Sequence, residues 1–249
     1  MESSNPVFGN APALKQPAPS VAELEEMLRA PQRLTMDAVV EKTALLLGLV
    51  VAGGALAWVA NVGMGLAMAA GLVGLVLALV NIFKRQVSPG LVLAYGAVEG
   101  VFVGALSRYM DTVYPGIAVQ AAIGTTAIFG TVLWAYKSGR IRATPRFTKI
   151  VVGAFVGMFA LLIVNLLAAW IGGGDGLGLR SGGGLAILFS LAFIVVGTLT
   201  FVLDFDQAER MVAQGVDARE AWRVAFGLVV GLVWLYLEVL RLLSYFRED

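Results

Sequence analysis

Seven long runs of apolar residues dominate the hydrophobic pattern of this chain, and charged residues gather between them. A transmembrane helix needs about 20 predominantly apolar residues. The pattern predicts spans at 43–60, 64–83, 91–109, 116–136, 150–171, 184–203 and 224–243. Only residues 61–63 join the first two spans, which predicts a tight hairpin there. We therefore expect an all-α, polytopic membrane protein.

The connections between the spans predict how the chain is oriented in the membrane. Residues 1–35, rich in Pro, Ser, Ala and Glu, predict a largely disordered tail ahead of a membrane domain at 36–249. Fourteen Lys and Arg residues lie in the tail and in the connections on its side, against four on the other side. Cytoplasmic connections carry the excess of Lys and Arg. We therefore expect a cytoplasmic N-terminus and a location in the plasma or inner membrane.

Small residues recur at helical spacing in two of the spans. Gly96, Gly100 and Gly104 follow one another every four residues in the third span, and Gly153 and Gly157 repeat the spacing in the fifth. Such small-xxx-small ridges let membrane helices approach closely. We expect both ridges to be helix-packing surfaces.

Composition narrows the function. Hydrophobic residues make up 59% of the 249 residues and charged residues 14%, against about 25% charged in a soluble domain; the mean hydropathy is +0.83. Cys and His are both absent, which excludes disulfides, thiolate catalysis and Cys-ligated zinc, and removes the commonest general base. The glycine-rich segment 172–178 contains G-x-G-D, but in an expected connection and not in a span. We expect no enzyme, no bound cofactor and no nucleic-acid partner.

Four acidic residues inside or beside the spans are the candidate functional residues. Glu99 lies midway along the third span, Asp204 and Asp206 end the sixth, and Glu238 lies in the last. An ionisable group at membrane depth is costly unless it is paired or hydrated, so it marks a functional site by default. Glu99 either makes a structural hydrogen bond or lines a permeation path. Arg85, at a span end, either reaches the interface or holds a carboxylate in a closed state.

Asp204 and Glu238 differ in their distance from the turn that joins the last two spans. If that turn lies at Gly215, Asp204 is 11 residues from it and Glu238 is 23, a difference in depth of about 18 Å at 1.5 Å per residue. A separate cytoplasmic helix at 217–226, or a bend at Gly227, would bring both to one depth. Two carboxylates there would share a proton, because like charges that close cannot both ionise in a low dielectric.

Two C-terminal motifs resemble the Bax inhibitor-1 family, also called the TMBIM family. The sequence DFDQ at 204–207 is similar to the D-x-x-Q or D-T-Q element that closes the family's sixth helix. LYLE at 235–238, followed by LRLL at 240–243, is similar to its L-Y-L-D ending. The seven spans, the first hairpin and the basic fourth connection also agree. TMDAVVEKT at 35–43 resembles a bacterial, YccA-like branch.

The resemblance implies a pH-sensitive calcium leak through a seven-helix bundle with the last helix at its centre. In the family, two facing aspartates share a proton and gate the path; the matching positions here are Asp204 and Glu238. The second acid is Glu here, Asp206 adds a carboxylate that favours cations, and the last connection is lengthened. Asp204, Asp206 and Glu238 are then candidate Ca²⁺ ligands, with Glu99 and Arg85 as accessory groups.

Three functions remain open at this point. The first is the calcium leak, with the lipid bilayer and Ca²⁺ as the partners. The second is a membrane-embedded regulator that binds another membrane protein, such as a quality-control protease or a stress or cell-death factor. A small-solute transporter is third, although no inverted repeat or pair of broken helices supports it.

Overall fold

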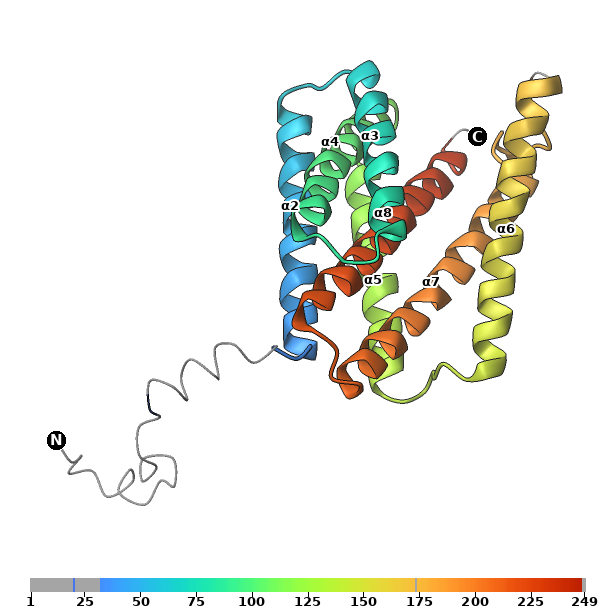
Figure 1. Ribbon diagram of the computed structural model, residues 1–249. Helices are drawn as coiled ribbons and strands as arrows, with labels where there is room; N and C mark the ends of the chain where they lie inside the picture. The colour runs from blue at the N-terminus through green and yellow to red at the C-terminus, as the bar shows by residue number, and fades with distance from the viewer. Residues whose placement is uncertain (1–19, 21–31, 173, 248–249) are drawn as a thin grey trace, which may run out of the picture. The chain divides into compact units, whose positions relative to one another are not determined.

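The computed structural model of the protein describes residue 20 and residues 32–172 and 174–247. In this part of the chain, seven helices are long and apolar enough to cross a membrane. They are α2 (Met36–Val59), α3 (Met64–Phe83), α4 (Pro89–Val113), α5 (Ile117–Lys137), α6 (Pro145–Gly172), α7 (Gly183–Ala213) and α8 (Ala221–Tyr245), with the short 3₁₀ helix η2 (Ala218–Glu220) before α8 (Figure 1). The expected all-α polytopic fold is confirmed. The predicted tail at 1–35 lies almost wholly outside the described residues.

Local chemistry sets several of the helix ends. Thr35 Oγ1 accepts a hydrogen bond of 3.2 Å from the Ala38 N–H and so caps the start of α2. Pro89 and Pro145 are the first residues of α4 and α6, a position where a missing N–H costs nothing. The α2–α3 hairpin turns through Asn61, whose φ of 54° lies in the left-handed region, which Asn tolerates better than most residues.

The last helix is the centre of the bundle, as expected. α8 packs against α2, α4, α5 and α7, and Figure 1 shows it running obliquely between these helices. Its most apolar window is 56% buried inside the protein, the largest share of the seven, whereas that of α6 is 11% buried. A helix with that much protein contact is positioned by its neighbours, while α6 is covered mainly by lipid.

α2 and α4 pack closely at the glycines of α4, as predicted from the small-residue ridge in the third span. A Cβ at Gly104 would collide with the backbone of Gly54, and one at Gly100 would lie 2.5 Å from the Val50 carbonyl oxygen. The two backbones are therefore in direct contact. The matching prediction for Gly153 and Gly157 is wrong, because a Cβ at either position would meet nothing within 4 Å. That ridge of α6 faces away from the other helices.

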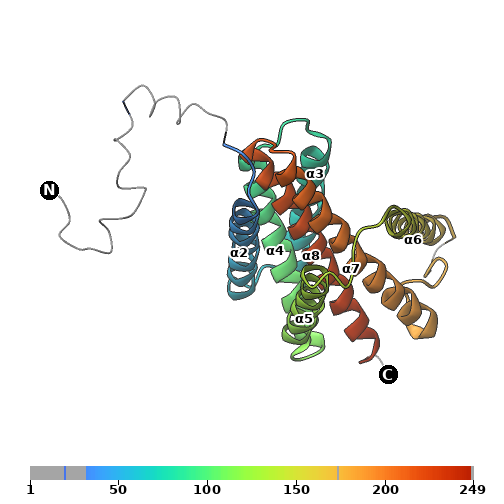
Figure 2. The ribbon, with the colours of Figure 1, turned by 90° about the horizontal axis from the view of Figure 1, so that it is seen from below.

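α6 stands apart from the rest of the bundle. It packs against α7, and both views place α7 between α6 and α8 (Figures 1 and 2). The loop after α6 is held by Asn165, whose Oδ1 accepts hydrogen bonds from the N–H groups of Leu177 at 2.9 Å and Leu179 at 3.3 Å. α6 is thus tied to the bundle through α7 and through this loop.

Candidate functional site

A cavity of about 580 Å³ lies beside α8, with walls from α3, α4, α6, α7 and α8. Its lining is mostly apolar and aromatic and includes five glycines. The titratable side chains in the lining are Tyr95, Glu99 and Asp204, and no Lys or Arg of the described residues contributes. The structure therefore brings Glu99 and Asp204, from two helices distant in sequence, into one apolar space.

Glu99 reaches this cavity from the middle of α4. Its side chain is 9% exposed, and within the described part of the chain it makes no hydrogen bond or ion pair. A Cβ at Gly74 of α3 would collide with Glu99 Oε2. Glycine at 74 is what leaves room for the carboxylate between the two helices.

Asp204 enters the cavity from α7 and is half-buried. It likewise has no ionic partner among the described residues. Asp206, two residues later, points elsewhere: it pairs with Arg210 at 2.6 Å, one turn along the same helix, and is not part of the lining. The two aspartates of the DFDQ motif are thus separated, one in the cavity and one in a partly exposed ion pair.

Glu238 is buried at a different place, where α8 meets the α6–α7 loop. Its side chain is 2% exposed, and Arg180 Nη1 donates to both of its carboxylate oxygens at 2.9 and 2.8 Å. Arg241 lies 3.5 Å away. The Arg180 guanidinium lies 5.6 Å from the ring centroids of Phe189 and Phe193, and the Arg180 carbonyl oxygen accepts a hydrogen bond from the Tyr245 hydroxyl at 3.2 Å.

The register of α7 against α8 keeps Asp204 and Glu238 apart. A Cβ at Gly197 would collide with the Trp234 ring, and one at Gly231 would lie 2.9 Å from Phe201 Cε1. These contacts place Asp204 opposite residue 228 or so of the antiparallel helix. Glu238 is then about ten residues further along, a difference in level of about 15 Å at 1.5 Å per residue.

The expected face-to-face pairing of Asp204 with Glu238 is therefore not present in this structure. The segment 217–226 does not take up the difference, because η2 leads directly into α8 and the helix continues through Gly227. Each acid instead has its own surroundings: Asp204 joins Glu99, and Glu238 joins Arg180. Nor do Asp204, Asp206 and Glu238 form one ligand set, since the described residues contain no group of three or more acids that would hold a metal ion.

Arg85 does not reach any of these carboxylates. Its side chain is exposed and outside the cavity, and its carbonyl oxygen accepts a hydrogen bond from Arg223 Nη2 at 2.7 Å. Arg223 also pairs with Glu220 at 2.6 Å. The contribution of Arg85 is thus to anchor the α3–α4 loop on the start of α8.

Aromatic side chains lie between the cavity and the Arg180–Glu238 pair. The rings of Phe193 and Trp234 meet edge-on with centroids 4.3 Å apart, and Phe155 of α6 lies 6.0 Å from Trp234. Phe189 stacks on Phe193 at 5.5 Å. We call Phe155, Phe189, Phe193 and Trp234 the aromatic cluster. It joins α6, α7 and α8: Phe155 and Trp234 line the cavity, and Phe189 and Phe193 lie against the Arg180 guanidinium.

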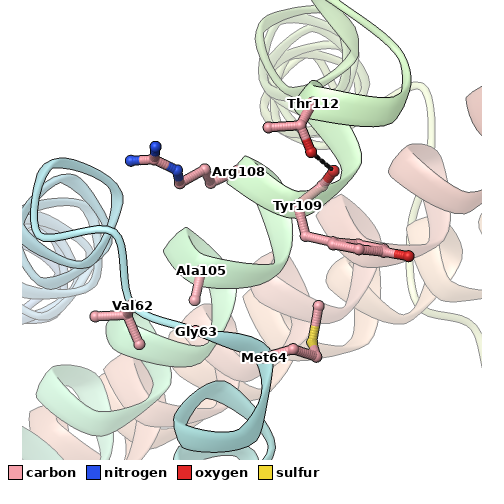
Figure 3. A pocket seen from close by; sticks show the side chains of 7 residues that line it. All are labelled: Val62, Gly63, Met64, Ala105, Arg108, Tyr109 and Thr112. Carbon is pink, nitrogen blue, oxygen red and sulfur yellow. Dashed lines mark hydrogen bonds between the residues drawn. The ribbon is translucent and has the colours of Figure 1, made fainter.

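A smaller pocket of about 190 Å³ lies under the α2–α3 hairpin (Figure 3). Arg108, Tyr109 and Thr112 of α4 form one wall, and Val62, Gly63 and Met64 of the hairpin form the other. The Arg108 guanidinium donates to the Trp58 carbonyl oxygen at the end of α2. This pocket has no acidic side chain in its lining. The contact of Arg108 with the end of α2 holds the hairpin against α4.

Sequence reasoning missed Arg180 and the aromatic cluster. Arg180 counted only as a charge of an outer connection, although a signal was available. A Glu deep in the last span requires a cation or water, and only Arg108, Arg180, Arg241 and Arg247 lie on that side of the chain. The cluster gave no comparable signal, because aromatic residues are common in spans.

Comparison with known proteins agrees with the fold and the motifs. In a search of curated proteins, no relative matches the sequence. A family model described as Bax inhibitor 1 like matches residues 5–248, nearly the whole chain. The chain belongs to this Bax inhibitor 1 like family.

Proposed function

We propose that the protein is a pH-sensitive leak channel for Ca²⁺, of the Bax inhibitor-1 type, with Glu99 and Asp204 in its ion path. The observation that carries the proposal is the meeting of these two carboxylates in one cavity that has no cationic side chain in its lining. Hard Ca²⁺ prefers carboxylate and carbonyl oxygens, and acidic groups are how cation pores select charge. We also propose that the protein resides in the plasma or inner membrane.

In this conformation the path is closed at the aromatic cluster. Hydrophobic constrictions exclude water and with it the hydrated ion. Beyond the cluster, Arg180 and Arg241 both lie against the single carboxylate of Glu238 and so place a net positive charge on the continuation of the path along α8. Opening requires that the α6–α7 loop and the aromatic side chains move, which the loose attachment of α6 permits. Glu238 keeps its gating role in this proposal, but through Arg180 and not through Asp204.

The pH response runs through carboxylates, because the chain has no histidine. Protonation of Glu99 or Asp204 removes the charge that attracts the cation. The groups facing them in the cavity are Tyr95 of α4 and the uncharged lining of α3, α6 and α8. Protonation of Glu238 acts differently, since it removes the ionic partner of Arg180 and Arg241.

The test is Ca²⁺ flux into liposomes that contain only the purified protein, measured against pH. We expect a saturable flux that varies with pH, and a much smaller flux in the double variant Glu99→Gln/Asp204→Asn, whose remaining pH dependence runs through Glu238. Glu238→Gln should raise the flux at neutral pH, because Arg180 is released. Glu41→Gln, an exposed position on α2, is the control. Absence of flux at every pH, or an unchanged profile in the double variant, contradicts the proposal.

A second candidate function is regulation of another membrane protein, and α6 favours it. This helix is 11% buried in its most apolar window and packs against α7, so most of its surface is free for another helix. Recovery of one membrane protein in stoichiometric amounts with the full chain, lost when exposed residues of α6 are replaced, together with no Ca²⁺ flux from the purified chain, would favour this function. That the chain is not an enzyme stays a prediction.

A further inference from the structure

We propose that the cavity between α3, α4, α6, α7 and α8 is a binding site for a lipophilic organic cation that enters sideways from the bilayer. This goes beyond the proposed Ca²⁺ leak: it uses the same carboxylates, but binding requires neither a path across the membrane nor flux. Four observations carry it: the size of the cavity, its walls, its charge and its open side.

Size and wall chemistry fit a small organic molecule. A volume of about 580 Å³ lies within the range of roughly 300–1,000 Å³ that small-molecule sites occupy. The walls are apolar, with the rings of Tyr95, Phe155, Phe159 and Trp234 among them. Aromatic faces attract cations, most strongly where water is excluded.

Charge decides which class of molecule fits. Glu99 is nine-tenths buried, lines the cavity and has no hydrogen-bond or ionic partner among the described residues. Asp204 adds a second carboxylate from the facing helix, and no Lys or Arg of the lining balances them. A buried carboxylate without a partner is costly, and a positively charged guest offsets that cost. An organic cation also matches the apolar walls, because it is weakly hydrated.

The cavity is open toward the lipid between α3 and α6. α3 packs on α4 and α6 on α7, and Phe159, on the α6 side of the lining, is 48% exposed. Leu75 and Leu79, on the α3 side of the lining, are 56% and 44% exposed. Lipophilic cations partition into the bilayer and so reach this opening without crossing an aqueous loop.

Gly227 makes the site easy to block. It lies in the lining, on α8, and a Cβ there would meet nothing within 4 Å. A Leu side chain at this position therefore starts from a Cβ that displaces no neighbour and takes up volume of the cavity. Gly157 of α6 is a matched control, since its Cβ would also meet nothing within 4 Å and it is not in the lining.

The test is equilibrium dialysis of radiolabelled tetraphenylphosphonium against the purified full chain in lipid nanodiscs. Tetraphenylborate, of the same shape and opposite charge, is the comparison ligand. We expect saturable binding of one tetraphenylphosphonium per chain and no saturable binding of tetraphenylborate. Glu99→Gln and Asp204→Asn should each weaken binding about tenfold, as expected for the loss of one charged contact. Gly227→Leu should abolish it, while Gly157→Leu and Glu41→Gln should leave it unchanged.

These experiments can reject the organic-cation site and the Ca²⁺ leak independently of each other. Equal binding of tetraphenylborate, or full tetraphenylphosphonium binding in Gly227→Leu and in the double variant Glu99→Gln/Asp204→Asn, overturns the organic-cation site whatever the Ca²⁺ flux is. Monodisperse elution and an unchanged unfolding temperature show that a variant is folded. If Gly227→Leu does not fold, the two carboxylate variants and the anionic comparison ligand still decide the question. Absence of Ca²⁺ flux with intact tetraphenylphosphonium binding removes only the leak.

Discussion

At the scale of single residues, a glycine on one helix and an acid on the next determine each other's geometry. Gly74 of α3 lies against the Glu99 carboxylate, and a Cβ there would collide with Oε2. Since Oε2 is the far end of a flexible side chain, an added methyl group moves the carboxylate and leaves the helices in place. The position of the charge in the cavity therefore depends on residue 74.

Gly74→Ala should accordingly change function more than stability. Alanine gains about 1 kcal/mol over glycine in a helix interior, which offsets the small cost of moving Glu99. We expect an unfolding temperature close to that of the natural chain and a Ca²⁺ flux clearly different from it. Gly157→Ala is the control: its Cβ meets nothing within 4 Å, so this substitution measures only the effect of the higher helix propensity of alanine on stability. An unchanged flux in Gly74→Ala would show that the Glu99 carboxylate is not in the ion path.

A second residue-scale prediction concerns the buried pair of Arg180 and Glu238. Removing one partner of a buried ion pair costs about 3–5 kcal/mol, whereas replacing both by apolar residues is often neutral. Arg241, 3.5 Å from Glu238 and 44% exposed, compensates the remaining charge only in part. Arg180→Met should therefore lower the unfolding temperature strongly, and Arg180→Met/Glu238→Met should restore most of it. Thermal unfolding in a double-mutant cycle measures the coupling. Glu41→Gln, in the exposed Lys42–Glu41 pair, should change stability by less than about 1 kcal/mol. A double variant no more stable than Arg180→Met contradicts the assignment.

At the scale of helices, the contact between α6, α7 and α8 is the constriction of the proposed ion path. Trp234 meets Phe193 of α7 and Phe155 of α6, so its side chain fills the space where the three helices come together. Removing it opens that space to water and weakens the constriction.

Trp234→Ala should therefore raise Ca²⁺ flux at neutral pH while it destabilises the protein. Truncation of a fully buried Trp costs about 3–5 kcal/mol, and the half-buried Trp234 should cost less than this. Trp170→Ala on α6 is the matched control, since that side chain is 83% exposed and should affect neither flux nor stability strongly. Flux in liposomes and thermal unfolding are the two measurements. Lower flux in Trp234→Ala than in the natural chain, with the fold retained, would mean that the aromatic cluster is not the constriction.

Sequence predicted the helices better than it predicted how they fit together. The positions of the spans, the hairpin at 61–63 and the Gly100–Gly104 ridge follow from residues close in the chain, and the fold and the ridge are confirmed. Register between α7 and α8 depends instead on contacts such as Gly197 with Trp234. A separate helix at 217–226, a bend at Gly227 and a continuous last helix were all compatible with the sequence, and in the structure α8 is continuous from Ala221 to Tyr245. For that reason Glu99 was recognised as a candidate while its meeting with Asp204 was not predicted.

At the scale of the whole molecule, the charges of the connections and the two acidic sites define an axis across the membrane. The end of α5, the α5–α6 loop and the start of α6 carry Lys137, Arg140, Arg142, Arg146 and Lys149, all exposed. Asp204 lies near the end of α7 on the same side, and the Arg180–Glu238 pair lies toward the other side. Since cytoplasmic connections carry the excess of Lys and Arg, we expect this side to face the cytoplasm. In that orientation the cavity acids lie nearer the cytoplasm, and the Arg180–Glu238 pair lies toward the outer end of the proposed path.

The absence of cysteine allows this orientation to be tested without altering any other residue. Ser138 in the α5–α6 loop and Ser181 in the α6–α7 loop are both exposed, and each accepts a single Ser→Cys substitution. A membrane-impermeant maleimide should label Ser181→Cys in intact cells and Ser138→Cys only after the membrane is permeabilised. The reverse labelling pattern would show that the protein has the opposite orientation in the membrane. Arg180 would then respond to cytoplasmic conditions, and the carboxylates of the cavity would meet the outside solution, so the pH that controls the path would be that of the opposite compartment.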